Sequence, residues 1–278
     1  MLSAIILTRN EASSIERCIA SLSFADEVIV VDSGSTDQTT LLAKRCGANV
    51  FTHAWAGYGE QKNFGAAKAM GQWLLFIDAD EELSPALAKT ITSLINTPAA
   101  KPPYDYYWLR IITIFLHRPL THLEGNNLRL FKKSAGHWND ATVHEQVVSD
   151  SNQTIKLGDP LSGRLSSPLF HYSHRTISSY LKKMHYYTTL DAKQMYTTGH
   201  HRSGRSYQPS TLLPYRLFLR QLVKLLFYRR GFLDGIAGCT WCFLSAYYEY
   251  EMGKKYLRLN RIEPQIPFNP SSPDKPLS

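Results

Sequence analysis

Residues 73–82, Trp-Leu-Leu-Phe-Ile-Asp-Ala-Asp-Glu-Glu, decide the fold, because a short apolar run there leads directly into carboxylates. In a β-strand, residues i and i+2 point the same way, so Asp78 and Asp80 can face one divalent cation. Alternatively, one can bind metal while the other binds a sugar hydroxyl. Mg²⁺ is usually held by one or two carboxylates and substrate phosphates. The pattern predicts a nucleotide-diphosphate site; a solvated turn after a strand is the alternative.

The segments upstream predict the sheet that carries this run. Three further strand-like segments precede it, at residues 3–8, 27–32 and 48–53. Helical patterns lie between the strands: a capping-box pattern at residues 13–16 that opens the first helix, and helices at 36–46 and 61–70. Strand-helix alternation with continuous apolar strands predicts a parallel sheet covered on both faces. Ligands of such sheets bind beyond the carboxyl ends of the strands.

Polar residues gather where the predicted strands end. The first strand ends in Thr-Arg-Asn-Glu at 8–11, and the second in Asp-Ser-Gly-Ser-Thr-Asp at 32–37. Asp32 can accept hydrogen bonds from a nucleotide base or ribose, and Gly34 permits a tight turn. The structural alternative is that Ser35 or Thr36 caps the next helix, with Asp37 near its positive end. The sequence contains neither a G-x-G-x-x-G motif after the first strand nor a P-loop, which argues against dinucleotide and P-loop enzymes.

Four motifs together resemble the GT-A-fold, family 2 inverting glycosyltransferases. They are Ile-Leu-Thr-Arg-Asn-Glu (6–11), Val-Val-Asp-Ser-Gly-Ser-Thr-Asp (30–37), Gln-Lys-Asn-Phe-Gly (61–65) and Phe-Ile-Asp-Ala-Asp-Glu (76–81). The resemblance implies an α/β fold: a Rossmann-like, nucleotide-binding mixed sheet flanked by helices, with a helical, basic C-terminal extension. Further segments resemble the branch that adds glucose to the inner core of lipopolysaccharide or lipooligosaccharide, at residues 127–131, 138–145, 171–174 and 230–235.

The resemblance also implies roles for individual residues. The donor, a nucleotide sugar such as UDP-glucose, is expected to meet Thr8, Asn10, Glu11, Asp32, Lys62 and Asp78. Mn²⁺ or Mg²⁺ would be held by Asp80, with His171 as a further ligand; a structural pair of His171 with His174 is the alternative. Glu145 is the expected general base and Asp140 the second candidate. For Glu145 the alternative is a structural ion pair with Arg129.

Charge is distributed unevenly along the chain. Residues 1–150 contain 13 basic and 16 acidic side chains, whereas residues 151–278 contain 18 basic and 7 acidic ones. A helix beginning near Pro214 would place Arg216, Arg220 and Lys224 on one face, opposite apolar residues. Such a helix predicts contact with an anionic membrane surface; a helix packed on the catalytic domain is the alternative. The uncharged stretch 235–248 is too short to span a bilayer.

These observations predict three segments: a catalytic domain at 1–175, a helical membrane-surface or acceptor-side region at 176–262, and a disordered tail at 263–278. Residues 197–210 are predicted to form a mobile loop. The expected acceptor is a glycolipid or phosphorylated oligosaccharide, with no nucleic acid as partner. Four cysteines and a start that runs straight into the first strand predict a cytoplasmic protein, peripheral on the inner face of the cytoplasmic membrane.

Two other functions each fit part of the sequence. A sugar nucleotidyltransferase also uses a nucleotide-binding α/β sheet, but residues 8–11 supply no glycine for a triphosphate loop. A basic nucleic-acid-binding protein would explain the positive C-terminal half, but the carboxylates clustered at strand ends would repel phosphate without a metal.

Overall fold

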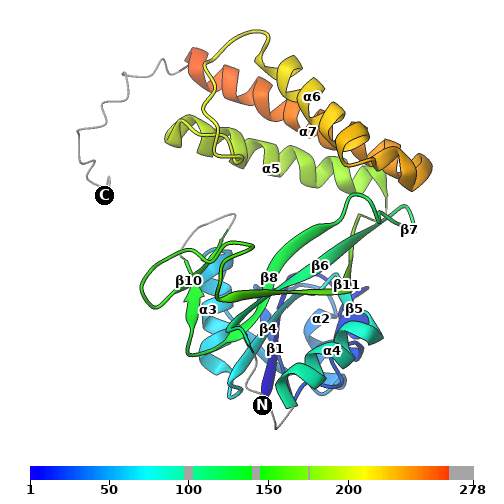
Figure 1. Cartoon of the computed structure of the whole chain (residues 1–278), viewed down its shortest axis with the longest axis vertical. Helices are drawn as coiled ribbons and strands as arrows, with labels where there is room; N and C mark the ends of the chain where they lie inside the picture. Colours follow the sequence, from blue (N-terminus) through cyan, green and yellow to red (C-terminus); the bar gives the residue numbers. More distant parts are fainter. Residues whose placement is uncertain (97–102, 140–144, 175, 263–278) are drawn as a thin grey trace. The chain divides into compact units, whose positions relative to one another are not determined.

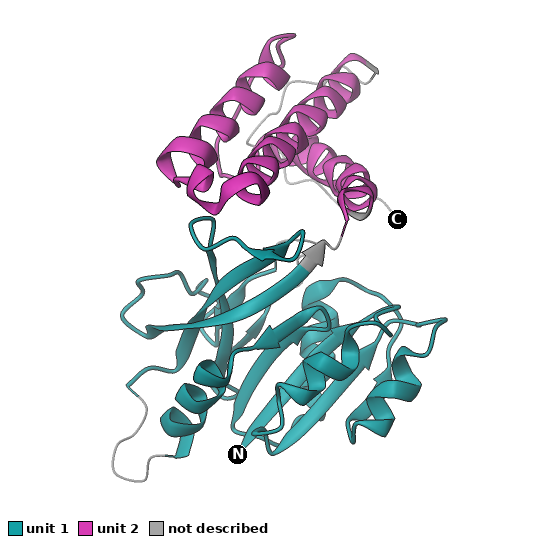
Figure 2. Cartoon of the chain, turned by 90° about the vertical axis from the view of Figure 1, so that its right-hand side faces the viewer, with its two compact units in different colours: residues 1–173 teal, residues 174–278 magenta. Residues whose placement is uncertain are grey.

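The protein folds into two compact units, residues 1–173 and 174–278, which Figure 2 colours separately. The structure is a computed structural model, and it describes residues 1–96, 103–139, 145–174 and 176–262. The predicted boundary after residue 175 lies two residues beyond this division. The predicted tail, 263–278, lies outside the described residues.

Unit 1 is built on four parallel strands that correspond to the four predicted ones. They are β1 (Leu2–Thr8), β2 (Glu27–Asp32), β3 (Asn49–Thr52) and β4 (Trp73–Asp78). In the sheet their order is β3-β2-β1-β4, so β1 lies between β2 and β4. Thr8 is in register with Asp32, and Leu7 with Asp78. The carboxyl ends of these three strands therefore meet at one edge of the sheet.

Beyond β4 the sheet becomes mixed. It continues through β8 (Gly125–Lys132), β6 (Tyr106–Phe115), β11 (Ser162–His174) and β5 (Glu81–Leu83), with β7 (Arg118–Pro119) attached to β6. β8 runs antiparallel to β4, and β5 runs antiparallel to β11. A separate pair is formed by β9 (Gly136–Trp138) and β10 (Val147–Ser149).

Helices cover both faces of this sheet, as predicted (Figure 1). They are α1 (Ile15–Ala20), α2 (Thr39–Arg45), α3 (Tyr58–Lys68) and α4 (Pro85–Asn96). Successive strand residues point to opposite faces, so Ile6 joins a core with residues of α1, α2 and α4, whereas Ile5 joins the core on the α3 side. Gly65 of α3 lies so close to β1 that an added Cβ would come within 2.5 Å of Ile5 Cγ2.

The helix starts differ from their predictions. The capping-box pattern at residues 13–16 lies one residue ahead of the observed helix start: Ser14 precedes α1 without a side-chain cap, and its hydroxyl donates to Glu11 at 3.2 Å. α2 begins at Thr39 rather than at residue 36. Ser35 and Thr36 instead form hydrogen bonds with Asn10, in the loop after β1. Asp37 accepts from the Thr39 amide at 3.0 Å. α3 begins three residues before its predicted start.

Unit 2 is helical. It contains α5 (Ile177–Thr198), α6 (Leu213–Val223), a π-helical turn (Lys224–Tyr228), a 3-10 turn (Gly231–Asp234) and α7 (Gly235–Ile262). Ala192, Met195, Leu217 and Met252 belong to its core. Within the described residues, no helix is both long enough and apolar enough to cross a membrane.

Residues of the predicted mobile loop 197–210 form hydrogen bonds with α7 of the same unit. His201 is buried, and its Nε2 lies 2.9 Å from the Glu249 carboxylate. Arg202 donates to the same carboxylate at 2.6 Å and also pairs with Asp191. The mobility of this loop stays a prediction; its contacts with Glu249, which lies 47 or more residues away, leave no trace in local sequence patterns.

Candidate active site

The loops after β1 and β2 are joined by side chains at the carboxyl edge of the sheet. Asn10 has a left-handed backbone (φ 56°), and its amide oxygen accepts from the Thr36 backbone N–H at 2.8 Å. The Asn10 backbone N–H in turn donates to the Ser35 hydroxyl at 2.8 Å. The Glu11 N–H donates to Thr39. Asn10 and Glu11 therefore shape the edge where a donor is expected. Their backbone N–H groups are already used in hydrogen bonds that join the two loops.

Asp32 lies at the end of β2, and the residue is buried. Its carboxylate accepts from the backbone N–H groups of Gly34 (3.0 Å) and Ser35 (2.9 Å), and from the Ser35 hydroxyl. Gly34 has φ 86°, which glycine adopts at little cost. Asp32 thus holds the turn in place. Beside it in register, the buried Thr8 hydroxyl has no hydrogen-bond partner in the described part of the chain.

Asp78, Glu81 and Arg129 form a charged group behind the strand ends. The Arg129 guanidinium, itself buried, donates to Asp78 and to Glu81, each at 2.7 Å. Burial raises the pKa of Glu81, and the negative charge of Asp78 raises it further. Arg129 acts in the opposite direction, and the resulting pKa is about 7. Desolvation opposes ionisation of Asp78 too, but Arg129 and Lys62 lower the pKa of Asp78 well below its usual range. Asp78 is therefore an anion at neutral pH.

Asp80 and His171 are brought together by strand pairing. β5 pairs with β11 so that Glu81 is opposite His171, and the Tyr172 N–H donates to the Asp80 carbonyl at 2.9 Å. His171 Nε2 then lies 3.4 Å from Asp80 Oδ1, with the two side chains 30% and 16% exposed. Burial would lower the pKa of His171, but its hydrogen bond to Asp80 and the nearby carboxylates raise it to about 9.

This pair fits a divalent cation as part of its ligand set. A carboxylate and an imidazole at one partly open site are suitable donors, and nucleotide-bound metals take their other ligands from phosphate and water. In the portion of the chain that the structure describes, no group of three His, Cys, Asp or Glu side chains forms a complete metal site.

Glu145 is paired with Lys62 rather than with Arg129, its predicted structural partner. Lys62 Nζ and Glu145 Oε1 form an ion pair, with side chains 5% and 14% exposed. Lys62 also lies over the Trp138 ring, 4.0 Å from its centroid. The charges of this pair act on Asp78 and Arg129 nearby. The other candidate base, Asp140, lies outside the described residues.

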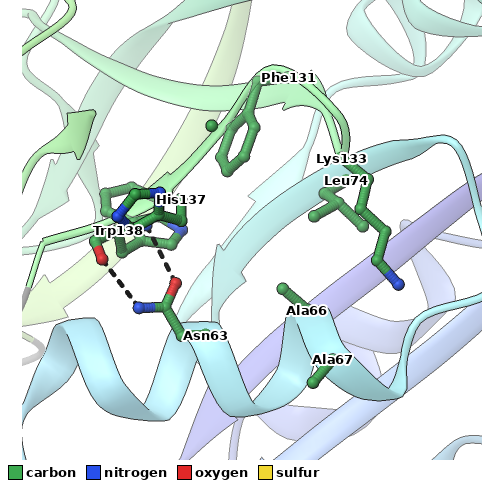
Figure 3. A pocket seen from close by; sticks show the side chains of 9 residues that line it. Asn63, Ala66, Ala67, Leu74, Phe131, Lys133, His137 and Trp138 are labelled. Atoms are coloured by element: carbon green, nitrogen blue, oxygen red, sulfur yellow. Dashed lines mark hydrogen bonds between the residues drawn. The ribbon is translucent and has the colours of Figure 1, made fainter. Parts of the chain in front are cut away.

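Asn63 fixes the strand that carries Trp138. Its side-chain amide donates to the Trp138 carbonyl at 2.8 Å and accepts from the Trp138 N–H at 3.0 Å, and Figure 3 shows it turned toward that residue. The cavity beside this clamp is small, about 220 Å³, and is lined largely by apolar groups such as Leu74 and Phe131. The clamp connects α3 to β9 next to the Lys62–Glu145 pair.

The structure thus places the described site residues in four groups: the β1–β2 loops, Asp78 with Arg129 and Glu81, the Asp80–His171 pair and the Lys62–Glu145 pair. Sequence reasoning missed Glu81, which is 1% exposed and bonded to Arg129. A charged residue directly after Asp-Ala-Asp was the available signal. The Asn63 clamp was also missed, because it joins segments 75 residues apart.

Comparison with known proteins gives the family of this chain. Residues 3–149 match the family described as Glycosyl transferase family 2. An uncharacterized glycosyltransferase of Rickettsia bellii is 32% identical over 281 residues, which covers 98% of this chain and 89% of that protein. A lipopolysaccharide core biosynthesis glycosyltransferase of Rhizobium meliloti is 29% identical, over 88% of this chain and 90% of that protein.

A crystal structure of glucosyl-3-phosphoglycerate synthase from Mycobacterium tuberculosis, in complex with Mn²⁺, UDP and glucosyl-3-phosphoglycerate, is 27% identical. The similarity has a TM-score of 0.34 and covers 40% of this chain and 44% of that one. The family match spans more than half of this chain, and the Rickettsia relative matches nearly all of it. The mixed sheet with flanking helices is the GT-A architecture expected from the sequence motifs. The chain belongs to glycosyl transferase family 2.

Proposed function

We propose that this glycosyltransferase moves a hexose, glucose from UDP-glucose, onto a glycolipid acceptor of the lipopolysaccharide core type. The observation that carries the proposal is the meeting of Asp32, Asp78 and the Asp80–His171 pair at one edge of the parallel strands. Ligands of open α/β sheets bind at this edge. The Rhizobium relative, named for lipopolysaccharide core biosynthesis, supports the choice of acceptor class.

The donor nucleotide lies across the carboxyl ends of β1 and β2. The Thr8 hydroxyl is a buried group that gains a partner when the donor binds. Asp32 contacts the base or ribose with lone pairs left over from its turn. Lys62 and Asp78 complete the site from α3 and β4, and Arg129 keeps Asp78 oriented.

Asp80 and His171 hold Mn²⁺ or Mg²⁺ in this proposal. The cation supplies charge neutralisation for the departing nucleoside diphosphate. A nitrogen ligand favours Mn²⁺, since Mg²⁺ is the harder ion and prefers oxygen throughout. Glu81 acts indirectly: it binds Arg129 and accepts from the Asp78 N–H at 2.9 Å, which steadies the Asp-Ala-Asp turn.

Transfer occurs by a single displacement with inversion. The acceptor hydroxyl oxygen bonds to the anomeric carbon, the bond from that carbon to the diphosphate breaks, and the hydroxyl proton passes to a carboxylate. Glu145 is that carboxylate, positioned by Lys62 and by the Trp138 strand. Asp140 is the second candidate for the role.

The acceptor brings the enzyme to a membrane. A glycolipid is presented at a lipid surface, and the C-terminal half has an excess of basic over acidic side chains. We therefore assign the protein to the inner face of the cytoplasmic membrane, held peripherally.

A donor panel tests the proposal. The full chain is incubated with Mn²⁺ and UDP-, GDP- and ADP-sugars, and released nucleotide is measured. Release of UDP from UDP-glucose above all others is the expected result. Transfer of radiolabelled glucose to a truncated lipopolysaccharide core, but not to lipid-free phosphorylated oligosaccharide, then identifies the acceptor. Donor hydrolysis confined to another nucleotide sugar contradicts the donor assignment, and transfer to the soluble acceptor alone contradicts the glycolipid.

A further inference from the structure

Unit 2 exposes many large apolar side chains within residues 212–243. Among them are Leu219, Val223, Phe227, Tyr228, Phe232 and Ile236, with exposed fractions from 47% to 86%. The surface of a soluble protein seldom has so many exposed apolar side chains in one segment unless that segment binds a partner.

A π-helical turn lies at the centre of this segment. α6 runs without a break into Lys224–Tyr228, and none of these five residues is buried. π-helical turns are rare and are frequent at functional sites. The chain then passes through Arg230 in the left-handed region (φ 55°), which ends the helix. The turn therefore presents Phe227 and Tyr228 outward instead of packing them into the core.

A basic groove lies beside the exposed apolar side chains. Its volume is about 580 Å³, and its walls include Arg205, Arg216, Arg220 and Lys224 together with Tyr207 and Tyr228. Arg220 donates to the Tyr207 hydroxyl, which orients its guanidinium. Among the described residues, no carboxylate pairs with any of the four cations.

The charged residues in the sequence around the groove are all basic. Residues 192–233 contain eight Lys and Arg and no Asp or Glu. Cations gathered without acidic neighbours repel one another, and an anionic partner relieves this repulsion. Guanidinium groups bind phosphate oxygens through paired hydrogen bonds, which makes arginine a favoured phosphate ligand.

We propose that this groove binds the phosphate-bearing headgroup of an anionic membrane lipid, while the exposed apolar side chains enter the lipid interface. Basic side chains beside aliphatic and aromatic ones are typical of surfaces that lie on anionic membranes. Nucleic acid fits less well: the aromatic rings here would stack on bases, but the aliphatic side chains of Leu219, Val223 and Ile236 would remain in water. The inference rests on the proposed membrane association and identifies the surface that makes it.

Vesicle flotation of the full chain tests the inference. Binding is compared between phosphatidylcholine vesicles and vesicles that also contain phosphatidylglycerol. The double variant Arg216→Gln with Lys224→Gln should bind the anionic vesicles about tenfold or more weakly, since each basic residue near an anionic surface strengthens binding several-fold. Phe227→Ser should weaken binding as well, and because Phe227 is 64% exposed its replacement should leave the unfolding midpoint in urea unchanged.

A matched control removes the same charge from another surface of unit 2. Lys182→Gln with Lys183→Gln alters two exposed cations of α5 and should leave flotation nearly unchanged. Equal losses in the two double variants would overturn the inference, because general charge would then explain binding. A rise in the unfolding midpoint with inorganic phosphate, in a protein that does not bind anionic vesicles, identifies a soluble phosphate ligand and also overturns it. So does tighter binding to single-stranded RNA at physiological salt.

Donor hydrolysis is measured on the same preparations. Unchanged hydrolysis with weakened flotation supports the groove and leaves the transferase site intact. Normal flotation with no hydrolysis of any nucleotide sugar contradicts the proposed function alone.

Discussion

Asp80 is the residue on which the proposed chemistry most depends. It is the carboxylate nearest His171, and its carbonyl is tied to β11. We expect Asp80→Ala to abolish transfer while the far-UV circular dichroism stays native, because charge on the leaving diphosphate would no longer be neutralised. EDTA should reproduce the loss in the unaltered protein. The control is Glu82→Ala, whose carboxylate pairs with Arg17 instead; full activity of the Asp80 variant or in EDTA contradicts the metal assignment.

Asp32 makes a separable prediction about donor binding. Asp32→Ala should raise the donor KM much more than it lowers kcat, because a base or ribose contact is lost. The same change removes three hydrogen bonds from the turn at Gly34 and Ser35, so thermal unfolding is followed in parallel. If donor affinity is unaltered, Asp32 only shapes the turn.

His171 makes metal binding depend on pH. A histidine must lose its proton to bind a cation, and the pKa of His171 in the metal-free protein is raised to about 9. Below that pH the metal displaces a proton, so the apparent Mn²⁺ affinity should rise with pH by up to about tenfold per unit and level off above pH 9. Mn²⁺ titration by calorimetry between pH 6 and 9.5, in two buffers, measures the slope and the proton release. In His171→Gln the slope should largely vanish; an unchanged slope excludes His171 as a ligand.

Glu145 and Lys62 are tested as a pair. Glu145→Gln should bind donor normally and lose roughly 10²- to 10⁴-fold in single-turnover transfer, the usual contribution of a positioned base. Asp140→Asn should lose much less. The ion pair offers a second explanation, a structural one, because removing one partner of a buried pair costs about 3 kcal/mol.

The double variant Lys62→Met with Glu145→Gln separates the two explanations. If Glu145 is structural, the double variant recovers stability in urea unfolding and also recovers single-turnover transfer at saturating donor, a condition that offsets the lost Lys62–donor contact. If Glu145 is the base, stability recovers while transfer stays low. A dead Asp140→Asn with an active Glu145→Gln would reassign the base to Asp140.

At the scale of elements, α3 is held against the sheet by close contact. Helix propensity alone predicts that Gly65→Ala stabilises α3 by about 1 kcal/mol. The structure predicts the opposite sign, because the new Cβ would come within 2.5 Å of Ile5 Cγ2 and 3.0 Å of Val31 Cγ2 on β1 and β2. We expect a loss of about 1–3 kcal/mol in the free energy of unfolding, measured in urea. A stabilised variant would mean that α3 can move away from the strands.

At the scale of the whole molecule, each unit has its own core. Residues 1–173 contain the mixed sheet except the last residue of β11, the apolar clusters described on its two faces, and every described site residue. The core of unit 2 comes from α5, α6 and α7. We expect residues 1–173 to fold alone and to retain donor hydrolysis, measured by circular dichroism and UDP release, while binding to anionic vesicles is lost. An unfolded fragment would show that unit 1 needs unit 2 for stability.

The four parallel strands and the carboxylates that follow them were predictable from the sequence, and the first three strands lie within one residue of their expected bounds. Local periodicity sets a buried strand, and Thr8, Asp32 and Asp78 follow from where each strand stops. The sequence also predicted the basic helix at Pro214, because its spacing of cations and apolar residues is local.

The partners of these residues emerge only when the chain is folded. Lys62 meets Glu145 across 83 residues, and β11 must pair with β5 before His171 can lie beside Asp80. Long-range pairs of this kind leave no periodic trace in the chain, because they depend on strand order and on which loops meet. For the same reason the sequence could not reveal that Arg129 serves Asp78 and Glu81 instead of Glu145, or that His201 anchors a loop to α7.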